Sequence, residues 1–253
     1  MGSVRYFGEG LTYLNPGRLR GKLIAIEGTD GVGRSTHIEM LQEWLEVQGY
    51  GVMTTGWTRS SLMSKAIEVA KKGNILDRWS FSLLYATDFA DRLEHQIIPA
   101  LRAGFIVLAD RYIYTAFARD IVRGGTPEWI RHVFGFALVP DLACYLRIDV
   151  DTLAMRVIES KGMNYWESGM DLRLGADLFD SFKKYQTQLI EQYDKMAEEF
   201  RFEVVDARKP PEEIQEVLRS KIEPILKTAK KTVPAAPVPE APPAGPLGEK
   251  VSS

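Results

Sequence analysis

The sequence of 253 residues predicts an α/β fold, in which a five-stranded parallel sheet has helices on both faces. Short apolar runs of strand length alternate with longer segments in which apolar residues recur at helical spacing. The runs are apolar at nearly every position, as is typical of parallel strands buried on both faces. There is no internal repeat, and 45% hydrophobic residues suit one domain with a sizeable core.

The elements follow one another in regular alternation. The apolar runs predict strands over residues 23–26, 51–55, 105–109, 142–148 and 202–205. The helical pattern covers residues 35–48, 60–72, 79–102, 151–160, 176–200 and 211–226, with two further helices between the third and fourth strands. We expect Pro99 to break the helix over 79–102, because proline cannot donate a helical hydrogen bond.

The two ends of the chain differ from the domain between them. Residues 1–20 are Gly-rich and irregular, and residues 228–253 hold six of the 13 prolines and no aromatic residue. We therefore predict a domain over 21–227, an N-terminal extension over 1–20 and a disordered tail over 228–253. The tail is either a solvated extension or a Pro-rich segment that contacts a partner, and its composition favours the first.

Charge and cysteine content exclude several functions. The 32 basic and 34 acidic residues nearly cancel, so the sequence has no electrostatic signature of binding to long nucleic acid or a membrane. The single cysteine, Cys144, excludes a disulfide framework and lies in an apolar run that predicts an unreactive thiol. No apolar run has the length of a membrane span and the start lacks a secretory signal, so we expect a cytoplasmic protein.

A phosphate-binding motif directly follows the first predicted strand. Its spacing is a glycine, four residues, a second glycine, a basic residue and a hydroxyl residue, which is that of a P-loop. Glycines let backbone N–H groups turn towards phosphate oxygens, and the next helix adds its positive N-terminal end. The residues expected to bind nucleotide phosphates are Gly28, Thr29, Asp30, Gly31, Val32, Gly33, Arg34, Ser35 and Thr36.

Two positions of this motif carry specific expectations. Arg34 stands where a P-loop usually has lysine, and its wider guanidinium is expected to clamp the β- and γ-phosphates. The Ser35 hydroxyl is expected to hold Mg²⁺. A strand-to-helix turn without a ligand is the alternative, and the combination of strand, spacing and helix argues against it.

A second pair of candidate residues, Asp110 and Arg111, follows the third predicted strand. The carboxyl ends of parallel strands face the crevice in which open α/β sheets bind ligands. Asp110 is therefore expected to organise the water ligands of the metal, and Arg111 to bind a second phosphate. The alternative for such a pair is a surface ion pair that contributes little.

In this order along the chain, the motifs resemble the thymidylate kinases, a family of P-loop nucleoside monophosphate kinases. The similarity covers nearly all of residues 21–226. It rests on the P-loop with its acidic Asp30, on the sequence Asp110, Arg111, Tyr112 and on shorter matches at residues 21–28, 97–101, 140–142 and 205–207.

The resemblance implies roles for residues on the side of the phosphate acceptor. Asp30 would contact the acceptor sugar, and Arg59 would join Arg111 on the monophosphate. Tyr85 falls where the family stacks an aromatic ring on the base. Thr115 stands for the family's hydroxyl residue shortly after the Asp-Arg pair and would contact the acceptor as well.

The resemblance also places a lid that closes over ATP at about residues 160–175. The lid carries two cations, Lys161 and Arg173. A P-loop with Gly31 instead of a basic residue resembles the variants that supply the catalytic arginine from the lid. Arg173 or Lys161 would then neutralise charge on the transferring phosphoryl group, together with Arg34.

Some positions depart from the family pattern. Phe89 stands where the family carries the arginine that reads the thymine edge, and Arg92, one helical turn on, is the candidate to replace it. Arg119 and Asp120 also replace residues typical of bacterial members, and the loop over 56–59 differs. These departures weaken the assignment of thymidylate more than that of phosphoryl transfer.

The sequence therefore predicts an ATP- and Mg²⁺-dependent kinase that converts a nucleoside monophosphate, in the first place dTMP, to the diphosphate. No general base is expected, because a phosphate oxygen is already an anionic nucleophile. The resemblance implies a homodimer. A kinase for another monophosphate and a nucleotide-binding regulatory protein without catalysis are the two alternatives.

Overall fold

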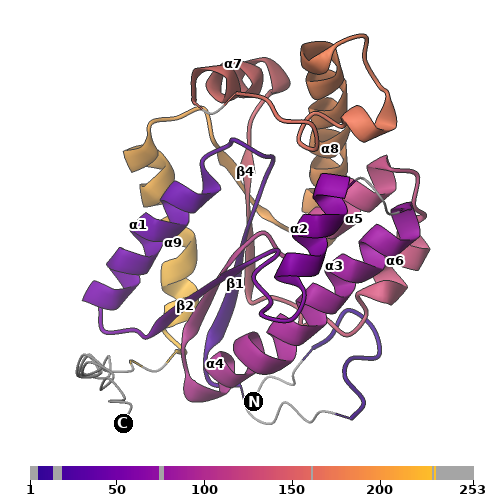
Figure 1. Ribbon diagram of the computed structural model, residues 1–253. Coiled ribbons are helices and arrows are strands. Elements are labelled where there is room, and N and C mark those ends of the chain that lie inside the picture. Colours follow the sequence, from indigo (N-terminus) through magenta and orange to yellow (C-terminus); the bar gives the residue numbers. More distant parts are fainter. Residues whose placement is uncertain (1–4, 14–18, 74–76, 161, 230, 232–253) are drawn as a thin grey trace, which may run out of the picture.

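The computed structural model describes residues 5–13, 19–73, 77–160, 162–229 and 231, and it confirms the predicted α/β fold (Figure 1). Within these residues, parallel strands form a five-stranded sheet in the order β2-β3-β1-β4-β5. Each predicted strand lies within one residue of its expected bounds. The strands are β1 (Lys22–Glu27), β2 (Val52–Gly56), β3 (Ile106–Asp110), β4 (Leu142–Arg147) and β5 (Glu203–Asp206).

Helices connect the strands, as the alternation predicts. They are α1 (Arg34–Val47), α2 (Ser64–Gly73), α3 (Arg78–Arg92), α4 (Ile98–Ala103), α5 (Ile113–Val122), α6 (Pro127–Val133), α7 (Val150–Ser160), α8 (Leu178–Phe200) and α9 (Pro211–Leu226). A π-helical turn, η1 (Leu93–Ile97), joins α3 to α4, so the change of helix type precedes Pro99. Pro99 itself lies in the first turn of α4, where its missing N–H costs nothing.

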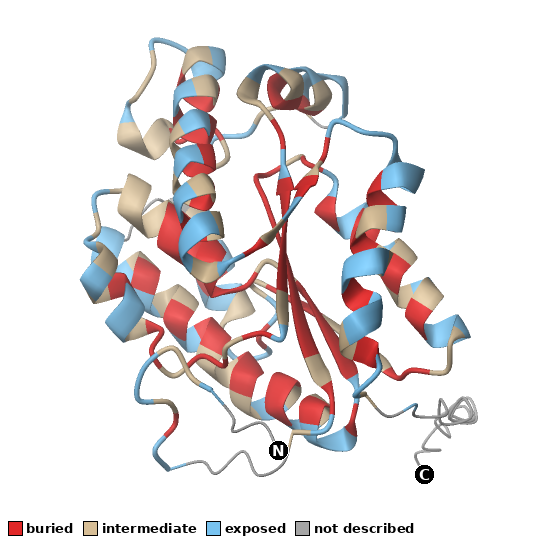
Figure 2. Ribbon diagram, turned by 180° about the vertical axis from the view of Figure 1, so that it is seen from behind, coloured by how far each residue is buried: buried red, intermediate tan, exposed pale blue. Residues whose placement is uncertain are grey.

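Side chains of the strands alternate between two hydrophobic cores, one on each face of the sheet. In β1, Leu23 and Ala25 pack with helices α3, α4, α5 and α8, whereas Ile24 and Ile26 pack with α1, α7 and α9. Figure 2 shows the central strands β1, β3 and β4 buried along most of their length between these two layers. Cys144 is fully buried in β4, and burial raises the pKa of its thiol to about 12, as expected for an unreactive cysteine.

The start of the described chain packs onto the domain. The Phe7 ring lies 5.6 Å from Tyr114 and 5.8 Å from Phe200, and Leu11 is 9% exposed within the same core. Residues 5–13 therefore complete the hydrophobic layer behind α5 and α8. The predicted disordered tail lies almost entirely outside the described residues. In the part of the chain that is described, no helix is long and apolar enough to cross a membrane.

Candidate active site

The P-loop connects the carboxyl end of β1 to the N-terminus of α1. Gly28, Gly31 and Gly33 have φ angles of 145°, 84° and 94°, which residues with a side chain rarely adopt. A Cβ atom at Gly28 would lie 2.9 Å from the Leu146 carbonyl oxygen. Gly33 faces open space instead, and directly precedes α1. The loop thus keeps a conformation that exposes its backbone at a helix N-terminus.

Arg34 binds the P-loop itself. Its Nη1 donates hydrogen bonds to the carbonyl oxygens of Gly28, at 2.5 Å, and of Thr29. Its Nε donates to Oδ1 of Asp110 at 2.9 Å, and the residue is only 7% exposed. A lysine could not make the same set of contacts, because it has a single terminal nitrogen. The Arg34 side chain, at the end of the loop, therefore connects the start of the loop at Gly28 and Thr29 with Asp110 at the end of β3.

Ser35 and Asp110 lie together, as their predicted role as a metal site requires. The register of the sheet places Asp110 of β3 opposite Ile26, just before the P-loop. The Ser35 hydroxyl donates to Oδ2 of Asp110 at 2.9 Å. A hydroxyl oxygen and a carboxylate are hard ligands of the kind that Mg²⁺ prefers, so this pair fits the predicted metal.

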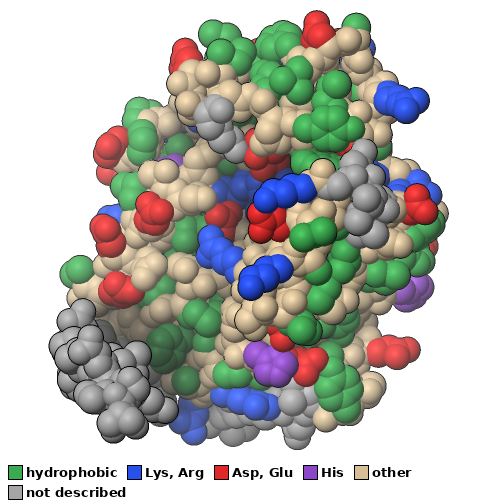
Figure 3. All heavy atoms as spheres, viewed as in Figure 1, with side chains coloured by type: hydrophobic (Ala, Val, Ile, Leu, Met, Phe, Trp, Pro, Cys, Tyr) green, Lys and Arg blue, Asp and Glu red, His purple; other side chains and the backbone are tan. Residues whose placement is uncertain are grey.

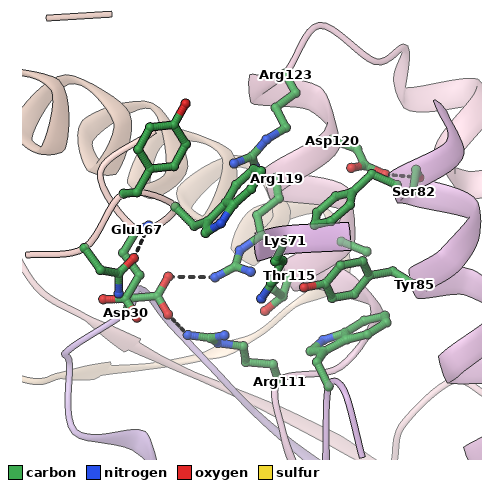
Figure 4. Close-up of a pocket in the computed structure, with 16 residues that line it drawn as sticks. Asp30, Lys71, Ser82, Tyr85, Arg111, Thr115, Arg119, Asp120, Arg123 and Glu167 are labelled. Atoms are coloured by element: carbon green, nitrogen blue, oxygen red, sulfur yellow. Dashed lines mark hydrogen bonds and ion pairs between the residues drawn. The ribbon is translucent and has the colours of Figure 1, made fainter. Parts of the chain in front are cut away.

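Arg111 and Arg119 converge on Asp30. The Arg111 guanidinium forms an ion pair with Asp30 Oδ1, and Arg119 Nη2 donates to Oδ2 at 2.7 Å (Figure 4). Arg111 has a φ angle of 68°, which turns its side chain out of the line of the strand. Burial, followed by the neighbouring Arg119, lowers the pKa of Arg111 to about 10. Two cations on one carboxylate leave a positive site suited to an anion.

This cluster lies at the junction of two hollows. A cavity of about 390 Å³ is lined by polar residues that include Asp30, Arg111 and Thr115, and by aromatic walls of Trp57, Phe81, Tyr85 and Trp166. A second hollow of about 520 Å³ runs along the P-loop and is lined in part by Ser35, Arg59 and Asp110. Both hollows share Asp30, Trp57, Arg111 and Glu167. Charged side chains gather in the centre of the face seen in Figure 3.

Two predicted base-contacting residues, Phe89 and Arg92, do not line the cavity. They are 0% and 1% exposed, and both pack against Trp57. Asp88 captures Arg92 through an ion pair of 2.9 Å and in turn accepts hydrogen bonds from the backbone N–H groups of Thr58 and Ser60. Arg92 lies on the same side of α3 as Phe89, as helical spacing predicts. Its guanidinium, however, is bound by Asp88 and packs against Trp57, which lines the cavity. We therefore assign neither Phe89 nor Arg92 a contact with the base.

The lid segment folds against α3 and α8 at its tip. The Trp166 ring stacks on Phe81 of α3, with centroids 5.6 Å apart and planes 11° apart. Gln186 of α8 donates to the Glu167 carbonyl oxygen at 2.7 Å. The predicted lid cation Arg173 is exposed, at a φ angle of 52°, and lines neither hollow. Lys161, the other, lies outside the described residues, so the catalytic role of the lid stays a prediction.

The cavity also contains residues that our sequence analysis did not assign to the site. They are Arg119 on α5 and Arg123, directly after its last residue, which follow the predicted Thr115 at intervals of four and line the cavity with it. Helical spacing predicts this shared face, and it could have been used to find Arg119 and Arg123. Arg123 is fixed by Asp171 at 2.9 Å.

Glu27, the last residue of β1, is fully buried beneath the site. Its carboxylate accepts hydrogen bonds from the Tyr112 backbone N–H at 2.7 Å and from the Thr115 hydroxyl at 2.8 Å. Burial is the largest influence and raises its pKa to about 7, although these hydrogen bonds and two arginines oppose the shift. Glu27 thus ties the end of β1 to the segment that carries Arg111 and Thr115.

A P-loop beside a cavity that contains two arginines paired with Asp30 is the arrangement of the class of P-loop nucleoside monophosphate kinases. Within that class, the chain belongs to the thymidylate kinase family. The family model described as thymidylate kinase matches residues 26–218.

Relatives that carry this family's name match most of the chain. A probable thymidylate kinase 2 of Saccharolobus solfataricus is 39% identical over 199 residues, which are 78% of this chain and 93% of the relative. A probable thymidylate kinase of Pyrococcus abyssi is 33% identical over 205 residues, 78% of this chain and 94% of the relative. A thymidylate kinase of Clavibacter michiganensis is 31% identical over 215 residues, with shares of 82% and 97%.

Proposed function

We propose that this chain transfers the γ-phosphoryl group of ATP to dTMP, giving ADP and dTDP. The observation that carries the proposal is the meeting of the two hollows at Asp30 and Arg111. A triphosphate along the P-loop and a monophosphate in the cavity would have their reacting phosphates at this junction. The names of the relatives and family membership support thymidylate as the acceptor.

On the acceptor side, each part of dTMP has a matching surface. Arg111 carries the charge for the monophosphate, and Arg59 lines the adjoining P-loop hollow together with Arg111. Tyr85 and Trp57 present ring faces to a flat base. Asp30 and Thr115 line the same cavity and are the polar groups that would contact the sugar.

The chemistry consists of positioning and charge neutralisation. An oxygen of the acceptor monophosphate attacks the γ-phosphorus, the bond to the ADP oxygen breaks, and no general base is required. The P-loop N–H groups, Arg34 and the lid cations Arg173 and Lys161 are the groups of this chain that would stabilise the charge. Ser35 and Asp110 would hold Mg²⁺, which when bound would screen the negative charge of the phosphates.

The test is ADP formation by the purified chain with Mg·ATP and dTMP, dUMP, UMP, CMP, AMP or GMP in turn. We expect turnover of dTMP above all other acceptors. Preference for another monophosphate would keep the mechanism and overturn the substrate. ATP binding without turnover of any acceptor would favour a regulatory protein instead.

We also propose that the chain is a homodimer that works in the cytoplasm. The resemblance to the family supports the dimer, and a contact between copies would cover exposed apolar side chains such as Val69 on α2 and Leu83 on α3, which are 63% and 50% exposed. Sedimentation equilibrium should give twice the mass of the chain, and a monomer at micromolar concentration would contradict the proposal. A partner contact through the Pro-rich tail concerns residues outside the described part.

A further inference from the structure

The cavity has two chemically different ends. Asp30 and Arg111 lie where the cavity meets the P-loop hollow, whereas Ser82 and Asp120 line the cavity alone. Figure 4 shows Ser82 and Asp120 on the opposite side of the cavity from Asp30 and Arg111. An acceptor with its phosphate at Arg111 therefore directs its other end, the base, towards Ser82 and Asp120.

The walls between these ends are aromatic. Phe81 and Trp166 are nearly parallel, and Tyr85 lies 5.0 Å from Phe81. Ring faces of this kind bind any flat base, because stacking does not read the hydrogen-bonding edge. Discrimination between bases therefore falls to the polar groups at the far end of the cavity.

Asp120 supplies a free hydrogen-bond acceptor at that end. Its Oδ2 accepts a hydrogen bond from the Ser82 hydroxyl, and no donor in the described part of the chain is bonded to its Oδ1. Burial raises the pKa of Asp120 to about 6, and the nearby Arg123 and Arg119 limit the shift. The side chain is therefore mostly ionised at pH 7.5 and accepts hydrogen bonds without donating any.

We propose that Asp120 is a specificity-determining residue, whose Oδ1 accepts a hydrogen bond from N3–H of thymine or uracil. The inference rests on the function proposed above. Thymine and uracil carry a proton on N3, whereas cytosine presents a lone pair there, which a carboxylate repels. Asp120 thus selects 4-oxo pyrimidines over the 4-amino pyrimidine, in place of the absent thymine-reading arginine.

The test compares kcat/KM for dTMP and dCMP in the wild type and in Asp120→Asn. Asparagine keeps the size of the side chain, loses the charge and offers an N–H that cytosine N3 can accept. We expect the dTMP to dCMP ratio to fall by about tenfold or more, the loss expected for one charge-assisted hydrogen bond. KM for ATP should stay unchanged. An unchanged ratio, or equal losses for both substrates, would overturn the assignment.

Asp194→Asn is the matched control, because it makes the same change in an ion pair on α8 that is partly exposed to solvent. Its ratio should equal that of the wild type. Ser82→Ala provides a second variant, should Asp120→Asn fail to fold. It removes the donor that orients the carboxylate, and we expect the ratio to fall by about threefold or more. An unchanged ratio in this variant would likewise count against the proposal.

Calorimetric titration with dTMP and dCMP, without ATP, separates this inference from the proposed reaction. A wild type that binds dTMP more tightly than dCMP but phosphorylates neither would refute the reaction. In that case loss of the binding preference in Asp120→Asn would still support the role of Asp120. A wild type that phosphorylates dTMP, with an unchanged preference in the variant, would refute the role of Asp120 alone.

Discussion

Replacing Glu27 with glutamine should change how the stability of the fold depends on pH. The carboxyl group is fully buried, and its pKa is raised from 4.5 to about 7. Below pH 4.5 it is protonated in both the folded and the unfolded chain. Between pH 4.5 and 7 the unfolded chain releases a proton that the folded chain keeps, so the wild type loses stability as the pH rises.

The size of this loss follows from the shift of the pKa. Each pKa unit corresponds to about 1.4 kcal/mol, so burial of the charge costs about 3 kcal/mol above pH 7. Glutamine has the same shape and carries no charge at any pH. The difference in unfolding free energy between Glu27→Gln and the wild type should therefore grow in favour of the variant by about 3 kcal/mol as the pH rises from 4.5 to 8.

Urea denaturation of both proteins across this range measures the difference. Glu216→Gln, an exposed glutamate on α9, is the matched control and should follow the wild-type pH dependence. Parallel curves for Glu27→Gln and the wild type would show that the carboxyl group is ionised as easily in the folded chain as in the unfolded one. That result would refute the argument from burial.

Three further substitutions test other parts of the site. Arg34→Lys removes contacts to the P-loop carbonyls and to Asp110, so its unfolding free energy in urea should fall by about 1–2 kcal/mol; unchanged stability would contradict the loop-closing role. Trp166→Ala removes the stacking on Phe81 and should raise KM for dTMP by about tenfold with little effect on KM for ATP; equal changes in both constants would argue against Trp166 as a wall of the acceptor cavity. Arg111→Met should lower kcat/KM for dTMP by about 100-fold, the effect of a lost charge-assisted contact, whereas Arg147→Met, in a partly exposed ion pair, should have no effect.

The strands and the P-loop could be predicted because their signals are local. A run such as residues 23–26 has to be buried on both faces, and the glycines at 28, 31 and 33 are needed for positive φ angles. The position of Asp110 at the end of a buried strand predicts that it faces the crevice. That it lies beside the P-loop follows from the strand order, which pairs β3 with β1. These inferences use backbone geometry, which neighbours in sequence largely determine.

The contact partners of long side chains are harder to predict from the sequence. Arg92 lies on the expected side of α3, yet Asp88 holds it beneath Trp57. The sequence predicts that Arg34 clamps the β- and γ-phosphates, which stays a prediction, and it does not predict that the guanidinium binds carbonyl oxygens of its own loop. In both cases the partner is a group whose position depends on the tertiary fold. Spacing along a helix predicts the side of the helix on which a side chain lies, but it does not predict which hydrogen-bond acceptor the side chain binds.

The packing of residues 5–13 has a consequence for the order in which the chain assembles. The backbone N–H of Phe7 bonds to the carbonyl oxygen of Ala137, and its ring contacts Phe200. The ribosome makes this segment before its partners Ala137 and Phe200. Tyr6, Phe7 and Leu11 thus remain without their final partners until most of the chain has been synthesised. Residues 5–13 therefore reach their place only after α8 has been made, and their docking closes the hydrophobic layer behind α5.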